Sequence, residues 1–182
     1  MLAYLFWHEP HDGVEPGPYV ERLQAFHRAL AAAPPPSFLR SWSVRLTAAP
    51  WDAGPARTPF EDWYLVSDWA ALGTLNEAAV RAPRDAAHDA IAAMATNGAG
   101  GLYLLKHGTL DRPAPWAGWV VKPQGEPYDT FEPRLCAAVD AAGGGAVLRR
   151  QMVLGPAPEY ALLATAEPEL PWPVRVTGPA PL

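Results

Sequence analysis

The chain has 182 residues, of which 49% are apolar, enough to fill the core of one ordinary domain or of two small halves. Its formal net charge is -5 and its 14 Lys and Arg residues are scattered with no run longer than two, so no basic stripe could follow the phosphates of a nucleic acid. The first residues lack the positive flank of a signal peptide, and no apolar run approaches the roughly 18 residues of a membrane span. We therefore expect a cytoplasmic protein with neither a nucleic-acid partner nor a membrane partner.

Two residue types are unusually frequent and one is scarce. A content of 22 prolines is typical of proteins from GC-rich bacterial genomes. The 8 tryptophans carry more information, because tryptophan tends to line cores, pockets and interfaces. The single cysteine, Cys136, excludes an internal disulfide and a Cys-based metal site.

The first 59 residues predict a strand, a helix and a second strand. Residues 2–7 form a buried strand, and a helix begins near Pro18, where a missing N–H costs nothing. Its apolar stripe consists of Tyr19, Leu23, Phe26 and Leu30. The prolines at 34–36 end this helix. Residues 38–46 alternate as a strand, and residues 48–59 form a loop rich in Pro and Gly.

A strand pattern then changes into a helix pattern at Asp68. Residues 60–67 predict a buried strand, and the apolar residues that follow share one helix face, namely Trp69, Leu72, Leu75 and Ala79. The Asp68 carboxylate can accept hydrogen bonds from the free N–H groups of the first turn, which predicts an N-cap. Because Pro83 disfavours helix at the preceding residue, a second helical piece begins near residue 84. Residues 97–101 end that piece, and residues 102–106 form a further strand.

A shorter version of the same order begins at Trp116. Residues 116–121 predict a strand. Asp129, with Glu132 three residues on, predicts a capping box around Thr130 at the start of a helix. Residues 146–154, 160–166 and 174–177 then predict strands, the first two joined by a turn.

Short sequence matches support an internal duplication. The segment YVERL at Tyr19 aligns with FEPRL at Phe131, and EDWYLV at Glu61 aligns with PEYALL at Pro158. In this alignment the second copy lacks its second helix, and residues 168–173 span the gap. Chance matching is the alternative, because the identities are few.

This doubled order of elements resembles a duplicated ferredoxin-like unit and, more narrowly, the dimeric α/β-barrel superfamily. The resemblance implies an α+β fold in which antiparallel sheets form an intramolecular α/β barrel. The first repeat would cover residues 1–110 and the second, shortened repeat residues 115–182, together in one compact unit. That superfamily includes cofactor-free monooxygenases, EthD-like proteins and haem-binding relatives, so the fold does not choose an activity. It implies a site between the open sheet face and the barrel lumen.

The candidate catalytic pair is His8 and Asp68. If the first and third strands lie parallel and adjacent, their carboxyl ends meet at one rim and bring these residues together. A carboxylate beside a histidine orients the imidazole and supports its charged form, as general base catalysis requires. The alternative is a helix cap at Asp68 and a solvated loop residue at His8. Strand parity places Tyr4 on the same face as His8 and Tyr64 on the same face as Asp68. If that face borders the lumen, the two tyrosines form its wall; the alternative is that they are ordinary core aromatics.

Other candidates rest on weaker patterns. Arg149 could hold an anionic ligand; the alternative is that it lies at an exposed edge of the sheet. Trp42 is a candidate ligand contact. The tryptophans in predicted strands suit a core, a pocket or the interface of a homodimer, and they are Trp42, Trp63, Trp116 and Trp119. The histidines considered as haem ligands carry no signature, and they are His27, His88 and His107.

The sequence thus favours a small-molecule-binding α/β barrel, either a cofactor-free monooxygenase or an isomerase acting on an aromatic ligand. It predicts no cofactor and no metal, because a His8 and His107 pair is disfavoured and no third ligand stands at helical or hairpin spacing. The absence of the GxGxxG, HExxH and GxSxG motifs argues against nucleotide binding, zinc proteolysis and serine hydrolysis. Two alternatives stay open. One is a structural or interaction module with a closed core, and the other is a haem-binding protein.

Overall fold

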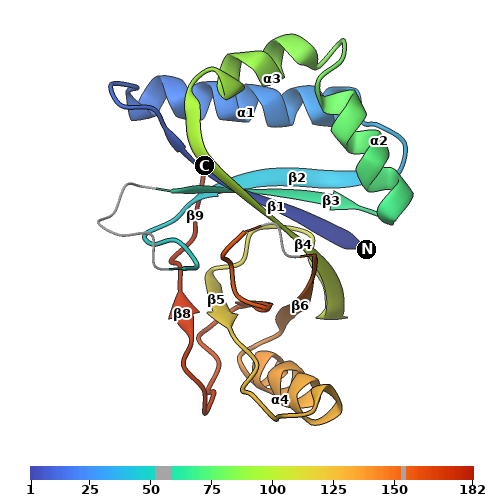
Figure 1. Cartoon of the computed structure of the whole chain (residues 1–182), viewed down its shortest axis with the longest axis vertical. Coiled ribbons are helices and arrows are strands. Elements are labelled where there is room, and N and C mark those ends of the chain that lie inside the picture. Colours follow the sequence, from blue (N-terminus) through green and yellow to red (C-terminus); the bar gives the residue numbers. More distant parts are fainter. Residues whose placement is uncertain (52–58, 153–154) are drawn as a thin grey trace.

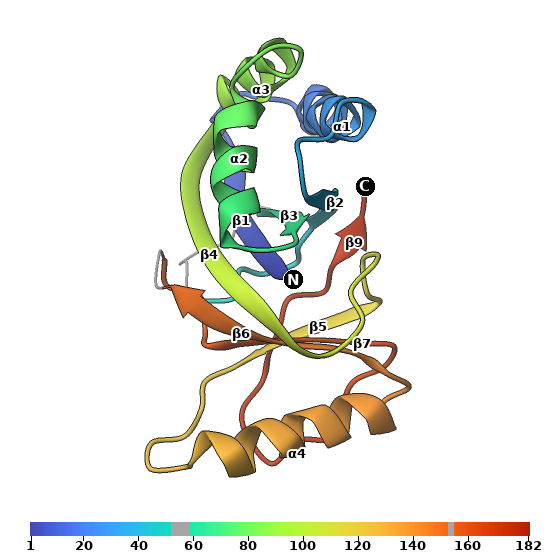
Figure 2. The same cartoon turned by 90° about the vertical axis from the view of Figure 1, so that its right-hand side faces the viewer.

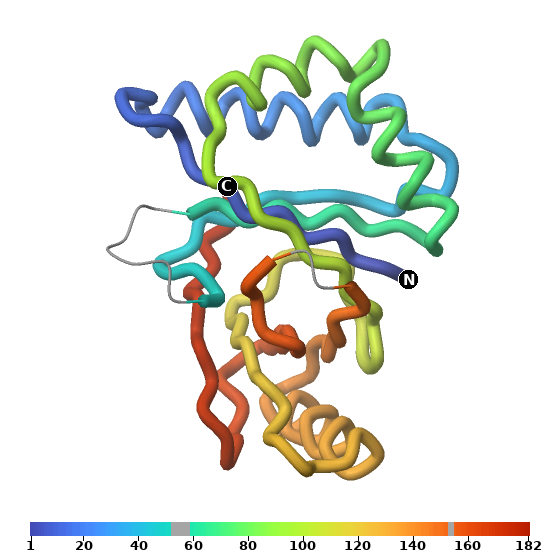
Figure 3. The backbone as a smooth tube through the Cα atoms, in the orientation of Figure 1, coloured from blue at the N-terminus to red at the C-terminus, as the bar shows by residue number. Residues whose placement is uncertain are grey.

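The computed structural model describes residues 1–51, 59–152 and 155–182, and Figure 3 traces the chain with the other residues in grey. Within the described residues the fold is α+β, with four helices and one antiparallel sheet of nine strands. The elements in chain order are β1 (Leu2–Pro10), α1 (Pro16–Ala32), β2 (Phe38–Arg45), β3 (Phe60–Val66), α2 (Trp69–Ala79), α3 (Asp85–Ala92), β4 (Ala95–Gly108), β5 (Trp116–Val120), α4 (Tyr128–Ala141), β6 (Gly145–Met152), β7 (Tyr160–Ala164), β8 (Arg175–Val176) and β9 (Ala180–Pro181).

The sheet curls, and the helices lie on its outer side. The strand order is β8-β5-β7-β6-β4-β1-β3-β2-β9. Helices α1, α2 and α3 cover the half that contains β1 to β4, whereas α4 covers the other half at the far end of the molecule (Figures 1 and 2). The long strand β4 joins the two halves through its pairing with β1 and β6.

Alternation along β1 divides its side chains between two cores. Ala3, Leu5 and Trp7 face the space enclosed by the curled sheet, whereas Leu2 and Tyr4 face the helices. The enclosed space holds what we call the shared inner core, which includes Trp7, Trp63, Tyr103, Trp119 and Leu148. These side chains are buried and fill the place where the sequence led us to expect a cavity.

The two edges of the curled sheet approach each other at the C-terminal segment. The backbone N–H of Thr47 donates to the carbonyl of Thr177 at 2.9 Å, and the N–H of Thr177 donates to the carbonyl of Ala117 at 3.2 Å. Thr177 itself is buried. Instead of the expected closed barrel, the structure is thus an open curled sheet whose edges are bridged by one short backbone segment.

The expected joint at Asp68 is confirmed. The Asp68 carboxylate accepts a hydrogen bond from the backbone N–H of Ala71 at 2.9 Å, and α2 begins at the next residue. The division of the helical region is also confirmed, because α2 ends at Ala79 and α3 begins at Asp85. No helix in the described part of the chain is long and apolar enough to cross a membrane.

Other local predictions were wrong. Helix α4 begins at Tyr128 behind Pro127, which makes no side-chain cap, so Thr130 is not the centre of a capping box. Strand β4 begins at Ala95, whereas the Asn and Gly residues from 97 to 101 had predicted a helix stop. Pairing with β1 overrides this local preference. The glycines also leave room for β1 side chains, since a Cβ on Gly100 would lie 3.1 Å from the Tyr4 ring. The predicted loop at 48–59 and the end of the predicted strand at 146–154 fall partly on residues outside the described ranges.

The predicted orientation of the central strands also needs correction. β1 pairs with β3 antiparallel, in a register that places Leu2 opposite Val66 and His8 opposite Phe60. The carboxyl end of β1 therefore meets the amino end of β3. This single reversal decides which residues accompany His8.

Candidate functional site

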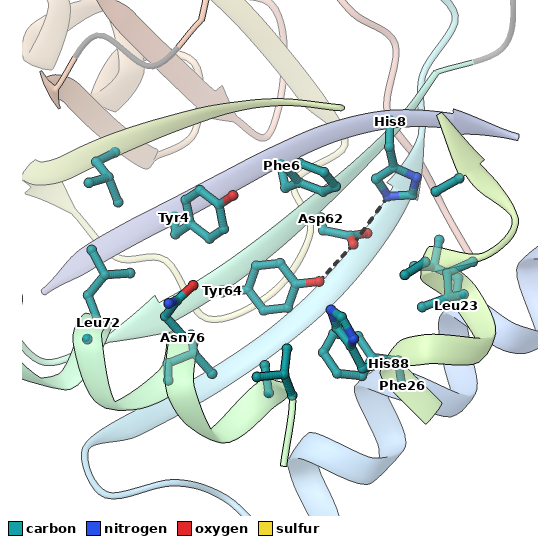
Figure 4. A pocket seen from close by; sticks show the side chains of 18 of the residues that line it. Tyr4, Phe6, His8, Leu23, Phe26, Asp62, Tyr64, Leu72, Asn76 and His88 are labelled. Atoms are coloured by element: carbon teal, nitrogen blue, oxygen red, sulfur yellow. Dashed lines mark hydrogen bonds and ion pairs between the residues drawn. The ribbon is translucent and has the colours of Figure 1, made fainter. Parts of the chain in front are cut away.

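A cavity of about 650 Å³ lies between the β1–β3–β4 part of the sheet and the helices α1, α2 and α3. We call it the helix-side cavity. Its walls are mostly apolar and aromatic, and exposed Trp69, Val80 and Met152 line its mouth. Figure 4 shows Tyr4, Phe6 and His8 on one strand facing Leu72 and Asn76 on α2. The cavity is thus on the opposite face of the sheet from the shared inner core.

Asp62 lies at the polar end of this cavity and is 2% exposed. Its Oδ2 accepts a hydrogen bond from the Tyr64 hydroxyl at 2.8 Å and lies 3.2 Å from Nε2 of His8. Dashed lines in Figure 4 mark both contacts. Its Oδ1 accepts a hydrogen bond from the Ser43 hydroxyl and lies 3.5 Å from Nε2 of His27. The carboxylate is therefore held by β1, α1, β2 and β3 together.

A second shell of hydrogen bonds fixes both imidazoles. Nδ1 of His8 hydrogen-bonds the Tyr19 hydroxyl, and Nδ1 of His27 lies 2.7 Å from the Ser41 hydroxyl. Nε2 of His27 lies 2.6 Å from the Ser43 hydroxyl. We call His8, Tyr19, His27, Ser43, Asp62 and Tyr64 the Asp62 cluster.

The surroundings of Asp62 favour its ionised form. Burial by itself would raise the pKa of this carboxyl, but the charges of the adjacent His8 and His27 outweigh burial and hold the pKa well below its ordinary value. Burial raises the pKa of Tyr64, and the adjacent Asp62 charge raises it further. The cluster therefore combines an ionised carboxylate with a hydroxyl that keeps its proton.

Tyr4 brings a further hydroxyl to the cavity wall. Its ring stacks on that of Tyr64, with centroids 5.9 Å apart and planes at 25°. Burial, followed by the charge of Asp62, raises the pKa of Tyr4, so this hydroxyl also stays protonated. A protonated phenol can donate to a ligand carbonyl or accept from a ligand donor.

Glu61 faces the shared inner core, on the other side of the sheet from Asp62. It is 1% exposed, and its two carboxyl oxygens accept from the indole N–H groups of Trp7 and Trp63, each at 2.7 Å. Burial raises the pKa of Glu61 to about 7, against the lowering effect of these two hydrogen bonds. Two adjacent acids on β3 thus have pKa values shifted in opposite directions, upward for Glu61 and downward for Asp62.

The raised pKa of Glu61 predicts that stability falls as pH rises. An unfolded glutamate loses its proton near pH 4.5 and the folded one near pH 7, so the folded state binds more protons between these values. This contribution to stability is complete below about pH 4.5 and is lost as pH rises through about 7, amounting to about 3 kcal/mol. Urea unfolding measures the free energies of unfolding of the wild type and Glu61→Gln from about pH 5 to about pH 8. Over this range the wild type should lose stability relative to the glutamine variant by about that amount.

The exposed Glu77→Gln variant is the control for this measurement, because Glu77 lies on the surface of α2. Its stability should follow the wild type at every pH. Parallel pH curves for the wild type and Glu61→Gln would contradict a titrating group at this position.

The structure brings together three of the six site residues that the sequence suggested. Tyr4, His8 and Tyr64 all line the helix-side cavity. The expected contact between His8 and Asp68 does not form, because the antiparallel register puts Asp68 beyond the opposite end of β3. Asp68 acts as the α2 cap, and Asp62 takes the expected place beside His8.

Trp42 and Arg149 lie elsewhere. Trp42 stacks on Trp63 with ring centroids 5.8 Å apart and packs against the shared inner core. Arg149 donates to Glu132 at 2.7 Å and lies over the ring of Tyr128, on the α4 side of the second half. Neither lines the helix-side cavity.

The three histidines considered for haem have different surroundings. His27 belongs to the Asp62 cluster. His88 lines the helix-side cavity, where its ring meets that of Phe26 edge-on. His107 pairs with Asp140 at 2.8 Å near the end of β4, far along the sheet from His8 in the β1–β4 register.

Sequence reasoning missed Asp62, although a signal was present. Two adjacent acids, Glu61 and Asp62, interrupt a strand that is otherwise apolar and buried from Phe60 to Val66. Buried carboxylates require partners, so this pair could have directed attention to the strand itself instead of to its end. The partners from α1 and β2 carried no comparable signal, because single His and Ser residues are also common on surfaces.

No group of three or more His, Cys, Asp or Glu side chains in the described residues is arranged to hold a metal ion. No protein-family model matches the chain, and comparisons with curated proteins and with solved structures find no significant match.

Proposed function

We propose that this protein binds a small, mostly apolar molecule in the helix-side cavity, with one polar group of the ligand directed toward Asp62 and Tyr4. The observation that carries the proposal is a buried, ionised carboxylate at the end of a mostly apolar cavity of about 650 Å³. Ligand sites of proteins are concave and mainly apolar, with a few convergent polar groups that fix orientation.

A neutral fluorogenic probe tests this proposal. N-phenyl-1-naphthylamine should gain fluorescence on entering the cavity, and Leu72→Trp should weaken its binding about tenfold or more because an indole would occupy part of the space. Leu39→Trp is the matched control, since Leu39 is 47% exposed on β2 and does not line the cavity. Equal binding by both variants would place the probe elsewhere, and no binding by the wild type would refute the proposal.

Acid–base catalysis is the second candidate function. It is favoured by Nε2 of His8, which lies 3.2 Å from the ionised Asp62 at the cavity. Isomerisation and cofactor-free oxygenation of an activated aromatic ligand both begin with removal of a proton from the ligand. A bound ligand with an acidic C–H group should therefore exchange that hydrogen in D2O with the wild type and more slowly with His8→Gln. Equal exchange rates would exclude His8 as the base.

We also infer that the two halves are copies of one ferredoxin-like unit, as in the dimeric α/β-barrel superfamily. The order β8-β5-β7-β6 in the second half repeats the order β4-β1-β3-β2 of the first, which supports this relation. Among the described residues, helices follow the third strand of the first half but not that of the second, and the helix-side cavity lies beneath these helices. The ligand site would then belong to the fuller copy.

A further inference from the structure

The charges around the helix-side cavity indicate which ligands it would accept, an inference that rests on the proposed function. Among the described residues that line the cavity, none is Lys, Arg or Glu, and Asp62 is the one carboxylate. An anionic ligand would therefore meet no permanently charged cation in the cavity wall. It would also approach a buried negative charge.

The negative charge of Asp62 is a stable feature of the site. Its pKa lies below the ordinary value, so the carboxylate stays ionised at neutral pH. The raised pKa values of Tyr4 and Tyr64 keep both phenols neutral. In surroundings of low dielectric constant, a carboxylate attracts a cation more strongly than it would in water.

His8 leaves part of the site unsatisfied. Its Nε2 is buried and, within the described residues, makes no hydrogen bond, because its contact with Asp62 at 3.2 Å lacks hydrogen-bond geometry. A buried polar atom without a hydrogen bond is uncommon in native proteins. A polar ligand group beside the imidazole could form the hydrogen bond that Nε2 lacks.

The cavity walls supply aromatic rings, which attract cations through their electron-rich faces. Five rings line it, and they belong to Tyr4, Phe6, Phe26, Tyr64 and Trp69. Aromatic walls combined with a carboxylate and no Lys or Arg suit an organic cation better than a neutral molecule or an anion. We propose that the ligand is an organic cation, an apolar or aromatic body carrying a protonated amine directed toward Asp62.

Three naphthalene probes of similar size separate charge from shape, namely 2-naphthylmethylamine as the cation, 2-naphthylmethanol as the neutral analogue and 2-naphthoate as the anion. At about pH 8 the amine should bind about tenfold or more tighter than the alcohol, and the naphthoate at least about tenfold weaker. Asp62→Asn should abolish that preference, and Glu77→Gln, on the exposed surface of α2, should leave it unchanged.

The outcomes separate this inference from the proposed function. Equal binding of the amine and the alcohol by the wild type, or tight binding of the naphthoate, would overturn the cation proposal and leave a small-molecule site in place. Absence of binding by all three probes would overturn both. The comparison of the three probes in the wild type decides the matter even if Asp62→Asn does not fold.

Discussion

Replacing Asp62 with asparagine is expected to lower the free energy of unfolding by about 3 to 5 kcal/mol at neutral pH, the usual cost of removing one partner from a buried charged cluster. Ser43 and Tyr64 donate to this carboxylate, and His8 lies 3.2 Å from it. An amide of the same shape presents one N–H2 group to donors and removes the negative charge, so buried groups lose their partners. Urea unfolding at neutral pH measures the loss.

The pH dependence of this loss has a defined sign. The folded-state pKa of Asp62 is depressed, so its contribution is present above about pH 4, where an unfolded aspartate ionises, and is lost as pH falls further. The gap between the wild type and Asp62→Asn should therefore narrow in acid. Glu77→Gln removes an exposed carboxylate and should change stability by less than about 0.5 kcal/mol. A comparable loss in that control would show a nonspecific effect of charge removal.

Replacing Trp119 with alanine is expected to cost about 3 to 5 kcal/mol, because the indole is buried and its removal leaves a large void. Trp119 belongs to the second half, yet its ring lies 5.5 Å from that of Trp7 on β1 and 5.7 Å from that of Tyr103 on β4. The void would therefore open between the two halves. Native-state hydrogen exchange should show β1 amides losing as much protection as β7 amides.

A mutation at the surface provides the control for this prediction. Trp69 is 50% exposed at the mouth of the helix-side cavity, and Trp69→Ala should cost less than about 1 kcal/mol. If Trp119→Ala lowered protection in β7 alone and left β1 unchanged, the halves would unfold separately. That result would contradict a shared inner core that couples them.

The Asp62 cluster and the shared inner core occupy opposite faces of the same strands. Glu61 and Asp62 are consecutive on β3, and alternation sends one toward the tryptophans and the other toward the helices. A residue that fills the inner face therefore aligns the site on the outer face. The shared inner core thus helps to position the residues of the helix-side cavity, although the core itself is not a ligand site.

Local chemistry in the sequence determined several elements of the fold. Apolar spacing placed the buried stripe of α1, and the carboxylate of Asp68 placed the start of α2, because helix periodicity and capping depend only on residues within a few turns. Strand parity on β1 correctly put Tyr4 and His8 on one face. Each of these predictions needed no knowledge of a distant partner.

The tertiary structure alone decided the partners across the sheet. Strand direction is set by pairing between segments about 50 residues apart, and the antiparallel register exchanged Asp68 for Asp62 as the neighbour of His8. Alternation along a strand shows that two faces exist, but it does not show which face is enclosed and which is covered by helices. The sequence therefore determined a histidine on a strand face and a capped helix after β3. Only the packed sheet decided that this histidine meets a buried carboxylate beneath the helices, because burial and register are properties of the whole chain.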